Sequence, residues 1–333
     1  MFYKKIKLIL ILFLFYQIPL YSKSTTFNAI DHKNISKYFS GIVAFGNKDN
    51  SKALEFFNSS KILINNHDPY LEKYVNSLVL ENKVSQAISL IKNNKDNKNI
   101  NFFDANILLV LDSLKKSDFD KADIYLQNIL KTSSPERFNS AIVESLKQYI
   151  HVFKHKNLLK KKRNLGKLSL ISETFQRCYL KDIQTETYFY NLINDNEADY
   201  KRYIYFYLSF LIENNRIEDA KRITDDLEFT DITLLLSQGK SWIENGQEKK
   251  FNEVFSCENH NDIISEFFFI ISNLYSSQDN YKKSNFYLNL SNFLNPKFVF
   301  NLSLVAENQY LNEEYKKAKK TLKSFKKEDT FYY

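Results

Sequence analysis

Glycine and proline are scarce in this chain of 333 residues, which has 5 Gly and 4 Pro against 29 Phe and 22 Tyr. Because β-sandwiches and β-barrels need many Gly and Pro corners, this composition disfavours both classes. Long periodic apolar runs with few helix breakers predict helices instead. The sequence also lacks a phosphate-cradling glycine loop, a dinucleotide fingerprint and a nucleophile elbow. We therefore expect an all-α protein that is not an enzyme and takes no small-molecule substrate.

Disulfide partners and metal ligands are equally few. Cys178 and Cys257 are the only cysteines, and they lie at different places within different predicted helical units. The sequence therefore predicts two half-buried free thiols, since an unpaired cysteine packs as a small hydrophobe. His151 and His155 are spaced to share one face of a predicted helix, but no third ligand accompanies them. We expect neither a metal site nor a cofactor.

The N-terminus has the layout of a targeting signal. Lys4, Lys5 and Lys7 precede an apolar run over residues 8–16. This order predicts a secretory signal peptide at 1–24, and the alternative is an uncleaved N-terminal anchor. We accordingly expect an exported protein, either periplasmic or anchored in the membrane and facing the periplasm.

A short sequence pattern recurs along the rest of the chain. In DNSKALEFFN (residues 49–58), a polar turn is followed by a small residue, Ala53, and four positions later by a large apolar residue, Phe57. Residues at i and i+4 lie on one helical face, so the small residue lets a neighbouring helix approach and the large one fills the space beside it. The position of Ala53, which we call the anchor position, recurs about every 34 residues, a period diagnostic of one class of helical repeat. Its equivalents are Ala87, Ala122, Thr185, Ala220, Phe251, Ser284 and Ala318.

Each copy of the pattern follows a second apolar helical stretch and a polar turn, so each unit is predicted to be a helical hairpin. In these features the chain resembles the tetratricopeptide repeat (TPR) family, and taken whole it is similar to exported TPR proteins of alphaproteobacteria. The resemblance implies an α-solenoid of about eight to nine hairpins wound into a right-handed superhelix. It rests on Gly41, Ala53, Phe57, Gly239, Trp242, Ser284, Pro296 and Ala318.

The repeat pattern is interrupted once. The interval between Ala122 and Thr185 is too short for two periods, and it contains the basic stretch KHKNLLKKKRNLGK. At the end of the chain, residues 331–333 would open a tenth hairpin. This favours a chain truncated within a repeat, and the alternative is that these three residues form an exposed contact. The predicted organisation is an N-terminal TPR block at 34–150, a basic degraded repeat or hinge at 151–167, and a C-terminal TPR block at 168–333.

The TPR resemblance also implies a function. In such a superhelix the first helix of each hairpin lines a concave groove that binds peptide or protein segments, so the leading hypothesis is a binding scaffold of the cell envelope. Arg202 to Tyr205 together with Lys240 form the densest group of candidates, since Arg and Tyr are common binding hot spots. The full set of candidate groove residues is Asn76, Lys115, Arg177, Arg202, Tyr205, Ser209, Lys240, Glu244, Asn273, Glu307 and Tyr310.

The basic stretch supports a second hypothesis. It concentrates much of the net charge of +8, with Lys160, Lys161, Lys162 and Arg163 at its centre. These side chains are predicted to contact an anionic membrane surface or an acidic partner, and the alternative is a solvated linker. Export makes nucleic acid an unexpected partner. A third hypothesis is that the chain is an accessory TPR domain of a longer protein.

Overall fold

The structure is a computed structural model that describes residues 31–130, 138–194, 201–227 and 233–325. Within these ranges the chain forms α-helices and short 3-10 helices and no strand, so the predicted all-α class is confirmed. The predicted signal peptide and residues 331–333 lie outside the described residues. None of the described helices is long and apolar enough to span a bilayer.

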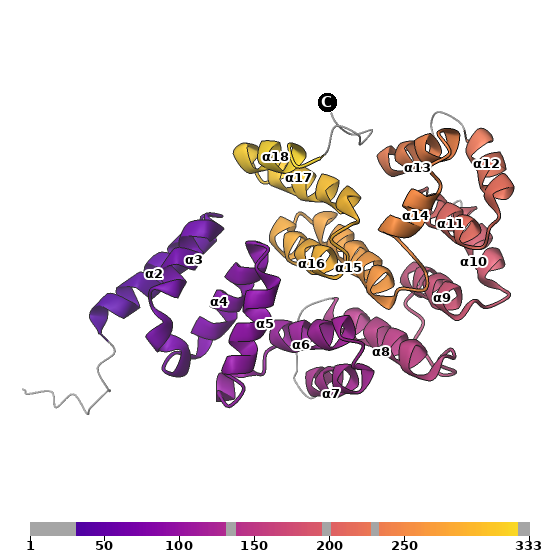
Figure 1. Cartoon of the computed structure of the whole chain (residues 1–333). Helices are drawn as coiled ribbons and strands as arrows, with labels where there is room; N and C mark the ends of the chain where they lie inside the picture. Colours follow the sequence, from indigo (N-terminus) through magenta and orange to yellow (C-terminus); the bar gives the residue numbers. More distant parts are fainter. Residues whose placement is uncertain (1–30, 131–137, 195–200, 228–232, 326–333) are drawn as a thin grey trace, which may run out of the picture.

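Most of the helices form hairpins of two, each with a first helix, a tight turn and a second helix (Figure 1). Short 3-10 helices precede three of the first helices, at Lys61–Asn65, Lys98–Ile100 and Val299–Asn301. The hairpins are α2 (His32–Gly46) with α3 (Asn50–Asn58), α4 (Asp68–Leu80) with α5 (Val84–Asn93), α6 (Phe103–Lys115) with α7 (Phe119–Leu130), α9 (Lys167–Leu180) with α10 (Thr185–Ile193), α11 (Arg202–Glu213) with α12 (Ile217–Asp225), α13 (Leu234–Glu244) with α14 (Lys249–Val254), α15 (His260–Ser276) with α16 (Tyr281–Leu294), and α17 (Leu302–Leu311) with α18 (Tyr315–Leu322).

The turns of these hairpins share one backbone conformation, in which one residue has a left-handed φ. In the first turn Lys48 adopts left-handed φ, and the next N–H, of Asp49, donates to the Ala44 carbonyl (3.0 Å), which closes the helix end as a Schellman motif does. Only one of the left-handed turn residues is a glycine, which explains how so many turns are built from so few glycines. These residues are Lys48, Asn82, Ser117, Lys181, Asn215, Gly246, Asp279 and Glu313.

The anchor position forms the tightest contact inside each hairpin. All the anchor residues are buried, and so is the residue four positions later in every described hairpin except α17–α18. That residue is large and apolar in each hairpin except α11–α12, where it is Thr224. A glycine on the first helix makes room for a ring on the second helix. A Cβ atom at Gly41 would lie 2.7 Å from the Phe57 ring, and one at Gly239 would lie 3.0 Å from the Phe251 ring. The packing role that the sequence assigns to the anchor pattern is therefore confirmed.

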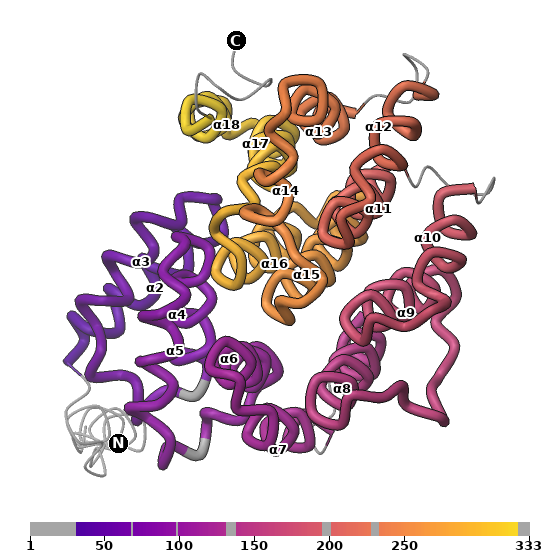
Figure 2. The backbone as a smooth tube through the Cα atoms, turned by 45° about the vertical axis from the view of Figure 1, so that its right-hand side comes forward, coloured from indigo at the N-terminus to yellow at the C-terminus, as the bar shows by residue number. Residues whose placement is uncertain are grey.

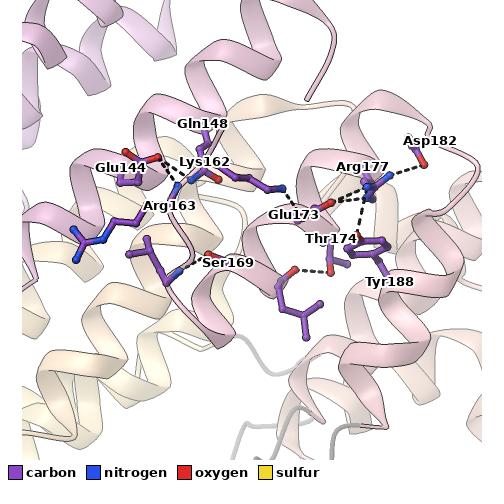
Figure 3. A network of polar contacts seen from close by, with 12 residues as sticks. Glu144, Gln148, Lys162, Arg163, Ser169, Glu173, Thr174, Arg177, Asp182 and Tyr188 are labelled. Atoms are coloured by element: carbon purple, nitrogen blue, oxygen red, sulfur yellow. Dashed lines mark hydrogen bonds and ion pairs between the residues drawn. The ribbon is translucent and has the colours of Figure 1, made fainter. Parts of the chain in front are cut away.

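The unit between α7 and α9 is different, since its described residues form one helix, α8 (Asn139–His155). Residues 156–166 then run to α9 without a second helix, in the stretch where the sequence predicts a degraded repeat. Polar contacts hold this connection in place (Figure 3). The Arg163 N–H donates to Glu144 (3.4 Å), and the Leu165 N–H donates to the hydroxyl of Ser169 (2.8 Å).

The array of hairpins curves back on itself, so that α15 and α16 lie on the inside of the curve (Figures 1 and 2). There α16 packs against α4, and α15 packs against α6, α8 and α9. At the rim, the first and last described turns meet. Lys48 Nζ donates to the Asn312 carbonyl (3.4 Å), and Lys317 Nζ donates to the Lys48 carbonyl (3.3 Å).

Candidate functional site

The inner surface of the array, where the sequence predicts a peptide-binding groove, is occupied by the chain's own α15–α16 hairpin. On α16, Asn289 donates to the Val79 carbonyl of α4 (2.8 Å), and Lys283 pairs with Asp104 of α6 (3.3 Å). Buried residues of α15 point in every direction around its axis, which is typical of an interior helix. Phe267 and Phe268 of this helix are fully buried. This surface is therefore part of the hydrophobic core.

The first residue of α15, His260, closes one end of this contact. Its Nε2 lies 2.8 Å from the Leu114 carbonyl, and its ring packs against Phe119 and Phe153. Burial lowers the pKa of the imidazole, so the neutral form donates to the carbonyl at neutral pH. The contact anchors α15 on α6.

An ion pair fixes the middle of α15. Arg202, at the start of α11, donates to both carboxylate oxygens of Glu266 (2.8 and 2.7 Å) and to Asn301 (2.9 Å). Its guanidinium also lies 3.7 Å from the centre of the Phe269 ring. Burial raises the pKa of the Glu266 carboxyl, and the adjacent guanidinium opposes that rise. Since both charges are withdrawn from water, each depends on the other.

The two cysteines form a disulfide, so the prediction of free thiols was wrong. Cys178 on α9 and Cys257, in the connection before α15, have Cα atoms 5.6 Å apart. The repeat pattern places the two cysteines in unrelated positions, and only the curvature of the array brings them together. The bond ties the connection that leads into α15 to α9.

Most of the candidate groove residues are buried or make contacts with other residues of the same chain. Tyr205 is fully buried, and buried Ser209 donates to the Phe255 carbonyl (3.1 Å). Arg177 pairs with Glu173 (2.7 Å). Lys240 donates to Thr224 (3.0 Å), Lys115 donates to Phe293, and Asn76 is half-buried on α4. Tyr205 and Ser209 in particular offer a partner no surface, because hairpins packed against α11 cover them.

The remaining candidates are exposed. Glu244, Asn273, Glu307 and Tyr310 lie on α13, α15 and α17 and are open to solvent. Arg202, Tyr205 and Lys240, the densest predicted group, do lie on neighbouring helices, since α11 packs against α13. The surroundings of these three residues belong to the core. Binding of a partner by the four exposed candidates stays a prediction.

The basic segment is partly neutralised within the fold (Figure 3). Lys162 pairs with Glu173 (2.5 Å), which also binds Arg177. Lys160 and Lys161 are exposed, and the guanidinium of Arg163 points away from the polar network in Figure 3. Of the four predicted surface contacts, Lys162 is therefore engaged and the other three remain free to meet an anionic surface.

An open groove, which we call the first-hairpin groove, is lined by α2, α3 and the turn that joins them. It has a volume of about 610 Å³. Phe39 and Val43, on α2, are 58% and 61% exposed within it. Its lining residues are Ser36, Phe39, Ser40, Val43, Ala44, Asn47, Asp49, Lys52 and Phe56.

The repeat register explains what this groove is. One period after Ser36, Ser40 and Val43 come Tyr70, Tyr74 and Ser77 on α4, and all three are buried. Tyr74 donates to Asn58 of the first hairpin (3.0 Å), and Tyr70 donates to the Phe57 carbonyl. In the second hairpin these positions therefore receive the preceding hairpin. In the first hairpin the same positions line the open groove.

The first-hairpin groove was not predicted from the sequence, because the TPR resemblance implies a binding groove on the inner surface of the superhelix. A signal was nevertheless present. Phe39 and Val43 form an i, i+4 apolar pair on a different face of α2 from Tyr38, Gly41 and Phe45, which point inward. A second apolar stripe on a helix of the first repeat indicates a surface on which a further segment packs.

The comparisons with known proteins add no family to this description. No family profile matches the chain, and no curated protein matches it in sequence. Within the described ranges, no group of three or more His, Cys, Asp or Glu side chains is arranged to hold a metal ion.

Proposed function

We propose that the chain is a TPR-like α-solenoid that acts as a non-enzymatic protein-binding scaffold, and that it binds a helical segment of a partner protein in the first-hairpin groove. The observation that carries the proposal is the exposure of groove positions that a preceding hairpin covers in the second unit. The α2–α3 hairpin supports it further, since its anchor pair Ala53 and Phe57 is buried and holds both helices in place.

The shape of the groove favours a helix over an extended strand. It runs between two helices, and its apolar side chains on α2, Phe39 and Val43, are one helical turn apart. In the second hairpin, the equivalent surface is covered by helices of the preceding unit. An amphipathic helix with apolar residues at i, i+3, i+4 and i+7 presents a matching ridge. Polar Ser36, Asn47 and Lys52 at the edges can bind the polar flank of such a helix.

The proposed compartment is the periplasm or another oxidising space. The N-terminal pattern of lysines and apolar residues supports export, and the disulfide between Cys178 and Cys257 supports it independently. Disulfides persist in oxidising compartments and are rare in reducing ones. Oxidation of these thiols in protein recovered from cells, measured by alkylation before lysis, tests this part of the proposal. Full alkylation without a reductant would contradict it.

Site-specific photocrosslinking tests the groove. A photoreactive side chain replaces Phe39 or, separately, Val43, and cross-linked peptides are identified by mass spectrometry. The matched control carries the same group at Ile124 on α7, which is 59% exposed, close to Val43 at 61%. We expect one partner peptide from both groove positions and none from Ile124.

A direct affinity measurement then decides whether the partner binds as proposed. The cross-linked segment is synthesised and titrated against the folded protein, and Val43→Asp is expected to weaken binding about tenfold by placing a charge in the apolar contact. Ile124→Asp is expected to leave binding unchanged. Equal binding by all three proteins, or a peptide that remains extended when bound, would rule out a helix in this groove.

A further inference from the structure

The last described hairpin, α17–α18, carries four exposed lysines on its second helix and at the C-terminal end of that helix. It lies at the edge of the molecule in both views (Figures 1 and 2). Lys316, Lys319, Lys320 and Lys323 are exposed, and no ion pair engages any of them in the described structure. Lys317 differs, because it pairs with Glu314 (2.6 Å) and reaches the first hairpin.

Apolar side chains border these lysines. Tyr315 and Leu322 are seven residues apart, about two helical turns, so both lie along one side of α18. They are 57% and 53% exposed. The ring of Tyr310 on α17 lies 5.3 Å from that of Tyr315, which extends the apolar strip onto the neighbouring helix. Lys319, one turn after Tyr315, stands beside the strip.

We propose that this surface, formed by Tyr310, Tyr315, Leu322 and the four exposed lysines and here called the terminal basic surface, binds the anionic phospholipid headgroups of a membrane. Lysines on the polar side of an amphipathic helix attract anionic lipids, while aromatic and aliphatic side chains enter the headgroup region. The proposal concerns a different surface from the first-hairpin groove and does not depend on it.

The residue types favour a lipid surface over an acidic protein. The basic side chains of α18 are all lysines, whose charge is compact and mobile, whereas recognition of individual carboxylates favours the planar, bidentate guanidinium of arginine. Tyrosine is enriched at membrane interfaces, where one end of the ring is apolar and the other is hydrated. Nearby acidic groups are fewer than the lysines. Glu307 on α17 and Glu313 in the turn are exposed, and Glu314 is already paired.

The basic segment before α9 provides a natural contrast. Lys160, Lys161 and Arg163 are exposed there, as the terminal lysines are. Their apolar neighbours Leu159 and Leu165 are half-buried and therefore less able to enter a headgroup layer. The terminal basic surface combines exposed lysines with exposed apolar side chains, and it is therefore the stronger membrane contact of the two.

Vesicle flotation with the full chain tests the proposal. Vesicles of phosphatidylcholine alone are compared with vesicles in which about a third of the lipid is phosphatidylserine. We expect the wild type to bind the anionic vesicles at least tenfold more tightly. The variant with Lys316, Lys319, Lys320 and Lys323 all changed to Gln is expected to lose this preference. The matched control changes Lys160, Lys161 and Arg163 to Gln and is expected to retain most of it.

A second measurement reports on the apolar strip. The chain has a single tryptophan, Trp242, which is buried, so Tyr315→Trp adds one exposed fluorophore. A blue shift of its emission on addition of anionic vesicles would show that this position enters the headgroup layer. Equal flotation on neutral and anionic vesicles, equal loss in both lysine variants, or binding of an acidic polypeptide such as polyglutamate in place of vesicles would each overturn the proposal.

Discussion

The hairpins α15–α16 and α17–α18 follow each other in sequence and carry the same repeat pattern, but they have opposite environments. Leu288 and Leu322 occupy the same place, four residues after the anchors Ser284 and Ala318. Leu288 is 1% exposed and Leu322 is 53% exposed. The pattern therefore indicates which face of a helix is apolar. The position of the hairpin in the array decides whether another helix of the chain packs against that face.

The two hairpins also differ in their charged groups. On α15 and α16, Glu266 and Lys283 are paired with Arg202 and Asp104 of other hairpins. Lys282 lies against α2, where its Nζ donates to the Phe45 carbonyl (3.2 Å), and the desolvation of its ammonium there lowers its pKa to about 8. Among the residues that the structure describes, the exposed lysines of α18 have no such partners. Charge inside the curve holds the fold together, and charge at the rim is left available to other molecules.

The largest expected effect on the free energy of unfolding comes from Arg202→Met, which removes a charge pair inside the curve. The change leaves the Glu266 carboxylate buried without its partner, so we expect a loss of about 3 to 5 kcal/mol in the free energy of unfolding, measured by urea denaturation. The control is Arg222→Met, which removes an exposed pair with Asp219 (2.7 Å) and should cost less than about 1 kcal/mol. The double variant Arg202→Met/Glu266→Leu should recover part of the loss. Equal effects of Arg202→Met and Arg222→Met would show that α15 is not held by this pair.

A second comparison uses the two equivalent leucines. Leu288→Ala opens a cavity in the core, so we expect a loss of about 2 to 5 kcal/mol in the free energy of unfolding. Leu322→Ala removes an exposed side chain and should cost less than about 1 kcal/mol. Both values come from the same denaturation experiment. Similar losses at the two positions would mean that the face of α18 is covered in solution.

The smallest expected effect is a pH dependence at Asp262 on α15. Burial raises the pKa of this carboxyl to about 6, although it accepts a hydrogen bond from the Ser256 N–H (3.1 Å). The folded state holds the proton more tightly than the unfolded state, whose pKa is near 3.8. Stability is therefore expected to fall by about 2 to 3 kcal/mol as pH rises from about 4 to about 6, and to change little above that range.

The variant Asp262→Asn isolates this effect, because the amide oxygen can still accept from Ser256 and does not titrate. Burial also raises the pKa of Glu213, so the wild type has a further contribution of the same sign. We expect the difference in stability between variant and wild type to grow across this pH range, as measured by urea denaturation at each pH. A constant difference would exclude Asp262 as a titrating group.

Much of the local structure was predictable from the sequence, because it depends on residues close together in the chain. The anchor residues and most of their large partners are buried as the pattern predicts, and Gly41 meets Phe57 across the first hairpin. Helical periodicity encodes these contacts directly. The candidate site was harder to predict from the sequence. Tyr205 and Ser209 carry the residue types of a binding groove and lie in the core, whereas Phe39 and Val43 look like ordinary helix residues until the surface around them is known.

The sequence by itself determined the hairpin, its period and the face that each helix buries, since all three follow from spacings within one unit. Only the tertiary structure decided that the array curves around α15–α16, that Cys178 meets Cys257 and that Lys48 reaches Asn312. The physical reason is cumulative. Each hairpin adds a small rotation to the next, and the single-helix unit at α8 alters the path, so contacts between distant hairpins depend on the sum of many junctions.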